Sequence, residues 1–167
     1  LALHAHVSEG GRGVPDGGAA LCVIGDETLK AYEEHLAQYG MVIQKVQEPS
    51  QVEFRFGNSS TSANLGQVDI PIGLGYNYFG LLRVYVVAGG APLLISNRAQ
   101  KAMTWMIDNE TDEIRSKALG LDLTVTLLPT GHYHVSLDEF PLSGELNPCN
   151  TKLVDDDEVW IFHDEKE

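Results

Sequence analysis

The stretch GRGVPDGGAALCVIG, residues 11–25, decides how the rest of the sequence is interpreted. An apolar lead-in ends at Pro15, Asp16 stands alone among glycines, and Ala19 begins an apolar run that ends at Gly25. A Pro-Asp-Gly-Gly sequence favours an ordinary surface turn, because proline fixes φ and glycine tolerates turn conformations. The same layout is also that of a turn that holds a catalytic carboxylate between two strands. The flanking elements must decide between these interpretations.

A helix is predicted directly after the loop. Asp26 is suited to cap this helix. Apolar side chains then recur at spacings of three and four residues, at Leu29, Tyr32 and Leu36. Gly40 ends the pattern, so one amphipathic helix is expected here.

After the helix the apolar residues recur with a period of two, which predicts half-buried strands. Residues 52–56 and 68–72 both alternate in this way, and the polar run 57–61 between them is suited to a hairpin tip. Residues 81–88 are apolar on both faces and are expected to form a central strand.

The second half of the chain predicts one short helix and several further strands. Ser96 is suited to cap a helix over residues 97–103. Strands are predicted at residues 105–107, 114–116, 121–128 and 132–137. Many short strands with two helices predict a mostly β, barrel-like fold.

The order of these pieces resembles the retropepsin-like aspartic proteases of retrotransposon polyproteins. The match spans roughly residues 11–139 and rests on three features: the loop Asp16-Gly17-Gly18-Ala19, the hairpin sequence Phe54-Arg55-Phe56-Gly57, and the run Pro92-Leu93-Leu94-Ile95-Ser96 before a short helix. The resemblance implies a closed acid-protease barrel with two short helices and an irregular acidic tail. It places Asp16 in the active-site loop.

The resemblance also implies where a substrate would bind. The expected flap tip over the substrate groove consists of Gly57, Asn58, Ser59 and Ser60. The expected segment behind the active-site loop consists of Leu93, Leu94 and Ile95. The family usually places glycine after the apolar pair, and this sequence departs from that pattern.

The chemistry of the family requires two carboxylates. One is ionised to activate water and the other is protonated to assist the carbonyl, because two like charges about 3 Å apart cannot both ionise. The sequence contains one Asp-x-Gly-Ala motif. Activity would therefore require a homodimer that brings together Asp16 of each chain, and a monomer would be inert.

Two residues of the loop depart from the pattern that catalysis requires. The family position after the catalytic Asp is Thr or Ser, whose hydroxyl fastens the two loops together, whereas this chain has Gly17. Pro15 has no N–H and can sit only at a strand edge or end. We therefore expect a degenerate protease domain that acts as a binding or structural subunit of a larger assembly, with a protein or peptide as its partner.

Two alternatives remain open at the level of the sequence. The first is an active homodimeric aspartic endopeptidase, which the retained Asp16, Gly18 and Ala19 favour. The second is a β domain unrelated to proteases, in which Asp16 would lie on an outer loop away from residues 93–96.

Composition excludes several classes of partner. The net charge is −13 and no cluster of Lys or Arg is present, which argues against nucleic acid. The longest apolar stretch, residues 79–95, is interrupted by Arg83 and Pro92, so we expect a soluble chain that does not span a membrane. Cys22 and Cys149 are expected to be ordinary reduced thiols.

No metal site or cofactor is expected. His4 with His6 and His132 with His134 each place two imidazoles on one strand face, but no third ligand accompanies either pair. His35 has no sequence neighbour that would suggest a general base.

We expect three parts: a flexible lead-in over residues 1–10, a domain over residues 11–140 that the resemblance implies to be retropepsin-like, and an acidic extension over residues 141–167. Residues 152–167 contain seven acidic residues against two lysines, which is typical of a solvated tail. Within the extension, the apolar run Val159, Trp160, Ile161 and Phe162 would either complete the domain's own sheet or bind a partner as an edge strand. Because position 1 is Leu, the chain is expected to be a processed or excised piece.

Overall fold

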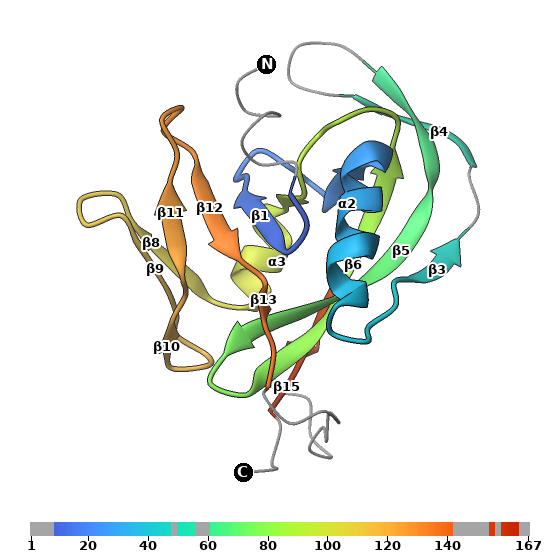
Figure 1. Ribbon diagram of the computed structural model, residues 1–167. Helices are drawn as coiled ribbons and strands as arrows, with labels where there is room; N and C mark the ends of the chain where they lie inside the picture. The colour runs from blue at the N-terminus through green and yellow to red at the C-terminus, as the bar shows by residue number, and fades with distance from the viewer. Residues whose placement is uncertain (1–8, 48–49, 56–60, 142–153, 156–157, 164–167) are drawn as a thin grey trace.

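The computed structural model describes residues 9–47, 50–55, 61–141, 154–155 and 158–163. These residues form a mostly β structure with two helices, α2 (Asp26–Ala37) and α3 (Asn97–Ala102) (Figure 1). No helix in this part of the chain is long and apolar enough to cross a membrane.

The larger of two sheets has 12 strands among the described residues. Its main path runs β11-β12-β1-β7-β2-β6-β15-β14, and β5 joins it by pairing with β6, β3, β4 and β13. The strands are β1 (Arg12–Pro15), β2 (Val23–Gly25), β3 (Gln44–Gln47), β4 (Ser50–Arg55), β5 (Thr61–Gly75), β6 (Tyr78–Val87), β7 (Leu94–Ile95), β11 (Val125–Leu127), β12 (Tyr133–Ser136), β13 (Asp138–Glu139), β14 (Val154–Asp155) and β15 (Val159–His163). The sheet is not closed into a barrel, so the closed barrel that the resemblance implies is not confirmed.

A smaller antiparallel sheet has the order β10-β9-β8. Its strands are β8 (Trp105–Asp108), β9 (Glu113–Ser116) and β10 (Leu121–Asp122). It lies beside β11 and β12 in Figure 1, where the Tyr133 hydroxyl is within hydrogen-bond distance of two acceptors in the β8–β9 turn, Asn109 Oδ1 at 3.1 Å and Asp112 Oδ1 at 2.9 Å.

Helix α2 covers the sheet at β2 and β6 (Figure 1). Tyr32 and Leu36 are buried and Leu29 packs beside them, so the predicted apolar face is confirmed. The predicted cap is wrong. Gly25 precedes the helix without a side-chain cap, and the Asp26 carboxylate instead accepts a hydrogen bond of 2.8 Å from the Gly89 N–H. Asp26 thus ties the helix to the loop after β6.

Strand β6 is central, as its two apolar faces predict. It pairs with β5 along one edge, and with β2 and β15 along the other. Leu82, Val84 and Val86 are buried in the core. Ile70 and Ile72 are buried within β5, as the alternation at residues 68–72 predicts, but the polar Asp69 between them is buried as well and is paired with Arg83.

The apolar run of the expected extension lies inside this sheet. Strand β15 pairs antiparallel with β6, with Val159 opposite Leu82, and Val159 and Ile161 are fully buried. Of the two alternatives for this run, the structure has the intramolecular one, in which the backbone bonds are made to the chain's own β6. The core therefore extends past residue 140, where the domain was expected to end, as far as β15.

Candidate active-site loop

The Asp16 loop connects β1 to β2, and β7 lies between these two strands. Strand β1 runs parallel to β7, with Val14 opposite Leu94, whereas β2 runs antiparallel to β7, with Val23 opposite Leu94 as well. The two arms of the loop therefore hold one short strand between them. This pairing favours a turn that is held between two strands over a free surface turn, because the loop is anchored on both sides.

Backbone hydrogen bonds fix the loop against β7. The Val14 N–H donates to the Leu93 carbonyl at 2.8 Å, and the Asp16 N–H donates to the Ile95 carbonyl at 3.0 Å. Gly13 allows close packing at this point, since a Cβ there would lie 2.9 Å from Ile95 Cδ1. Asp16 thus lies next to the run 93–96, not on an outer loop away from it.

The structure places the expected substrate-binding run beneath the loop. Leu93 and Ile95 are fully buried and Leu94 is half-buried. Leu93 and Ile95 therefore pack in the core beneath the loop. The four residues of the expected flap tip, 57–60, lie outside the described residues; the strands on either side of them, β4 and β5, pair as an antiparallel hairpin.

The tip of the loop is a tight turn built on the aspartate itself. Asp16 Oδ1 accepts a hydrogen bond of 2.9 Å from the Gly18 N–H, and the Asp16 carbonyl accepts one of 3.2 Å from the Ala19 N–H. Gly17 and Gly18 are exposed and Asp16 is partly exposed. The arrangement presents a carboxylate at the surface on a turn whose shape depends on backbone bonds.

The two unusual loop residues fit this turn for different reasons. Pro15 is the last residue of β1, as the sequence predicts. Proline has no N–H to donate to Ile95 opposite it, and the Ile95 carbonyl accepts a hydrogen bond from the Asp16 N–H. A Cβ built on Gly17 would meet no atom within 4 Å, and the φ angle of Gly17 lies outside the left-handed region. The fold therefore does not require glycine at position 17.

A buried polar cluster lies under the loop and joins three distant segments. Glu158 is 5% exposed, and its two carboxylate oxygens accept hydrogen bonds from the Cys22 N–H at 2.9 Å and the Ser96 hydroxyl at 2.8 Å. The Ser96 hydroxyl also accepts a bond of 3.0 Å from the Ala99 N–H, so Ser96 caps α3 as predicted. The acid of the expected solvated tail is thus an internal brace of the loop. Sequence reasoning missed it.

Cys22 belongs to the same cluster and is chemically quiet. Burial raises its pKa to about 12, and the nearby Glu158 charge contributes in the same direction. A thiol with this pKa stays protonated at physiological pH and is a poor nucleophile. Cys22 is a free, buried thiol, as expected, and Cys149 lies outside the described residues.

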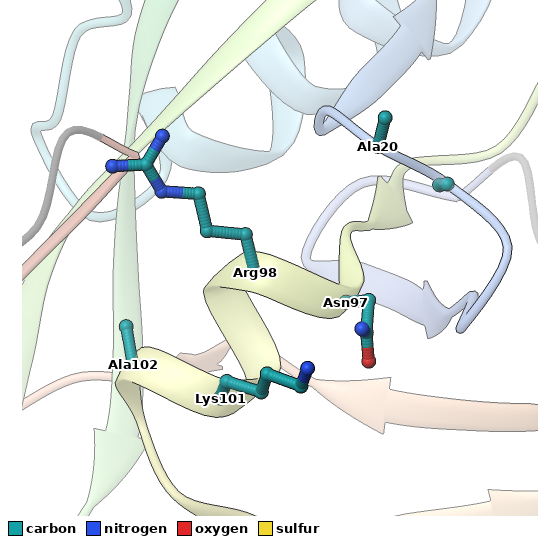
Figure 2. Close-up of a pocket in the computed structure, with 6 residues that line it drawn as sticks. Ala20, Asn97, Arg98, Lys101 and Ala102 are labelled. Atoms are coloured by element: carbon teal, nitrogen blue, oxygen red, sulfur yellow. The ribbon is translucent and has the colours of Figure 1, made fainter.

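A hollow of about 520 Å³ lies between the loop and α3 (Figure 2). Its lining consists of Ala19 and Ala20 from the loop and Asn97, Arg98, Lys101 and Ala102 from the helix. In Figure 2, Lys101 and Asn97 lie on one side of α3 and Arg98 extends to the other. The hydrogen bond of 3.2 Å from the Asn97 N–H to the Ala19 carbonyl holds the two walls together.

A second polar cluster lies at the start of β1. Asp138 lies 2.7 Å from His35 Nε2, and it accepts hydrogen bonds of 2.8 Å from Arg12 and 2.9 Å from Ser136. Burial raises the pKa of Asp138, but the hydrogen bonds from His35 and Ser136 and the charge of Arg12 outweigh that effect and hold its pKa below the usual value. His35 therefore has a charged neighbour that its sequence context did not reveal.

The described part of the chain contains no group of three or more His, Cys, Asp or Glu residues that could hold a metal ion. His132 is exposed and contacts the Thr130 hydroxyl, whereas His134 is buried. Burial lowers the pKa of His134, so the neutral ring is favoured there. His4 and His6 lie outside the described residues.

Comparison of the chain with protein-family models, with curated proteins and with solved structures found no match. Function is therefore inferred from the geometry of the Asp16 loop, from the brace beneath it and from the hollow beside it.

Proposed function

We propose that the chain is a retropepsin-like domain of the aspartic-protease class that has lost catalysis and acts as a protein- or peptide-binding module in a larger assembly. The observation that supports this most directly is the placement of β7 between β1 and β2, with Asp16 hydrogen-bonded to the Ile95 carbonyl. A surface turn would not need such an anchor on both arms. The proposal includes the barrel-like closure that the family would have.

Loss of catalysis is inferred from position 17. A threonine or serine hydroxyl there would fasten two loops across a dimer, and each lost hydrogen bond removes about 0.5–1.5 kcal/mol of net stabilisation. The pair of carboxylates would then be held less firmly. A displacement of about 1 Å from the productive geometry can cost about 100-fold in rate.

Binding is assigned to the exposed side of the loop. Asp16, the hollow beside Ala19 and Ala20, and the β4–β5 hairpin would together contact an extended peptide. Because β15 is committed to β6, we place the partner site at the loop and not at the run 159–162.

An active homodimeric aspartic endopeptidase is the second candidate. It is favoured by one observation: the turn that presents Asp16 is held by the Gly18 and Ala19 N–H groups, which do not depend on the side chain at position 17. In this case two copies would meet through their exposed loops, and Asp16 of each chain would form the dyad.

One experiment separates the two candidates. The purified chain and its Asp16→Asn variant are incubated with a mixture of peptides at mildly acidic and neutral pH, and both cleavage products and retained peptides are measured by mass spectrometry. If the chain is a binding module, we expect peptides that are retained but not cleaved. Cleavage that disappears in Asp16→Asn would establish the endopeptidase instead. A result in which no peptide is retained and none is cleaved would contradict both candidates.

A further inference from the structure

The hollow beside the Asp16 loop differs in charge from the molecule as a whole. The chain has 24 acidic residues against 11 Lys and Arg, yet none of the described residues that line this hollow carries a carboxylate. Two of these six residues are cationic, namely Arg98 and Lys101. The local surface is therefore suited to an anionic ligand, whereas the net charge of −13 would by itself attract a cationic one.

The polar wall of the hollow consists of hydrogen-bond donors on one helix face. Asn97 and Lys101 are four residues apart on α3 and so lie on the same side of the helix. Figure 2 shows the Lys101 side chain extending towards Asn97. Within the described part of the chain, neither side chain has a hydrogen bond or ion pair. An ammonium group and an amide group are thus available together at one wall.

The opposite wall is apolar. Ala19 and Ala20 contribute only methyl groups and backbone to the hollow. A group that fits between the two walls needs an aliphatic part for the methyl groups and an acceptor end for the ammonium and the amide. The Asp and Glu side chains have this form, since an ionised carboxylate only accepts hydrogen bonds and lysine only donates them.

We infer that the peptide segment that binds at the Asp16 loop carries an Asp or Glu side chain, and that this carboxylate binds Lys101 and Asn97. The inference rests on the proposed function, because it names the chemistry of the peptide that the loop would hold. It opposes the effect of the net charge, which by itself favours basic peptides. Peptide preference is therefore a discriminating measurement.

The test uses pools of randomised octapeptides with an acetylated N-terminus and an amidated C-terminus, in which one central position is fixed as Glu, Gln or Lys. Peptides retained by the immobilised chain are quantified by mass spectrometry at low and at physiological ionic strength. A further Gln pool with a free C-terminal carboxylate distinguishes a side-chain carboxylate from a chain terminus. We expect enrichment of the Glu pool over the Gln pool by about five- to tenfold at low salt, and less at higher salt.

The matched variants are Lys101→Gln at the hollow and Lys117→Gln on the small-sheet side of the chain, where the lysine is also exposed. Lys101→Gln is expected to remove the advantage of the Glu pool and to leave the Gln pool unchanged, and Lys117→Gln to change neither. Asn97→Ala is expected to lower the retention of the Glu pool by a smaller factor than Lys101→Gln does.

Four results would overturn the inference. Equal retention of the Glu and Gln pools, or equal effects of the two lysine variants, would show that peptide binding is blind to the hollow, with the proposed binding function intact. Lys101-dependent enrichment of only the free-carboxylate pool would assign the hollow to a chain terminus. Retention of no pool at all would contradict the proposed function together with the inference.

Discussion

Gly17 has no structural reason to be glycine. Its φ angle lies outside the left-handed region, and a Cβ would meet no atom within 4 Å. Gly25 is the opposite case, because a Cβ there would lie 2.3 Å from the Gly89 carbonyl oxygen. The missing hydroxyl at position 17 is therefore a property of the sequence that the fold of a single chain does not impose.

We predict that Gly17→Thr is tolerated. Replacing glycine where the backbone suits other residues restricts the unfolded chain, so the free energy of unfolding should change by less than about 1 kcal/mol, towards stabilisation. Urea denaturation followed by circular dichroism measures this change. Gly25→Ala is the control and should lose about 1–3 kcal/mol, because the added methyl group has no room. A comparable loss in Gly17→Thr would show that the loop packs differently.

The backbone of Tyr76 lies in the left-handed region, which asparagine and glycine adopt more readily than tyrosine. It lies in the turn between β5 and β6 with φ 53°, Asn77 follows with φ 66°, and the Tyr76 side chain is 76% exposed. We predict that Tyr76→Asn raises the free energy of unfolding by about 1 kcal/mol, since asparagine tolerates the left-handed region. Thermal unfolding tests this, with Tyr76→Phe as a control that should change little. Destabilisation by Tyr76→Asn would mean that the ring packs against the protein.

At the scale of the elements, the Asp138 cluster holds the start of β1 to α2 and to β12. Arg12 comes from β1, His35 from α2 and Ser136 from β12, and all three contact Asp138. Tyr32 also donates a hydrogen bond to the Arg12 carbonyl. Loss of the Asp138 charge would therefore loosen three elements at once.

Stability in acid should depend on Asp138. Its pKa is lowered in the folded state from the ordinary value of 3.8, so its contribution is complete above that value and is lost as the pH falls through the lower, folded-state pKa. We expect Asp138→Asn to unfold at a lower temperature at neutral pH and to lose less of its stability than the wild type between about pH 4 and pH 2. Differential scanning calorimetry over this range tests the prediction. Asp122→Asn, at an exposed ion pair with Arg115, should leave the acid profile unchanged.

The elements that the sequence predicted are those with a local signal. The face of α2, the Ser96 cap and the central position of β6 each follow from residues a few positions apart. The Asp26 cap was wrong because a carboxylate at a helix start can also bind a neighbouring loop, and here the Gly89 N–H provides that alternative. Local pattern alone does not distinguish these two partners.

The candidate site was predictable only in part, because its support comes from far along the chain. The position of the run 93–95 behind the Asp16 loop was expected only from the family resemblance, and in the structure β7 pairs with both arms of the loop. Glu158 bonds to Cys22 across 136 positions and His35 contacts Asp138 across 103, and no periodicity signals either pair. An acidic segment is normally solvated, so burial of one of its carboxylates becomes visible only from the strand pairing.

For the whole molecule, the strand pairing predicts that residues 154–163 are required for stability. Removal of residues 154–167 would expose the β6 edge and leave the Cys22 N–H and the Ser96 hydroxyl without their acceptor. Burial of Val159 and Ile161 contributes about 1.5–3 kcal/mol each, so we expect the shortened chain to lose several kcal/mol and to unfold at a much lower temperature.

Glu158→Gln isolates the brace from the strand. It should lower the free energy of unfolding by about 1–3 kcal/mol, because one amide group cannot accept both hydrogen bonds. Glu113→Gln, at an exposed position of β9, is the matched control and should have little effect. A fully stable chain without residues 154–167 would show that β15 is dispensable, contrary to the sheet described above.

The pairing of β15 with β6 also sets the order in which the site can form during synthesis. The loop around Asp16 leaves the ribosome early, but the carboxylate that braces it is encoded some 136 positions later than its partner Cys22. Until that last strand has emerged and docked, the amide of Cys22 and the cap of α3 lack their acceptor. The brace under the Asp16 loop is therefore completed only after β15 has been translated and has paired with β6.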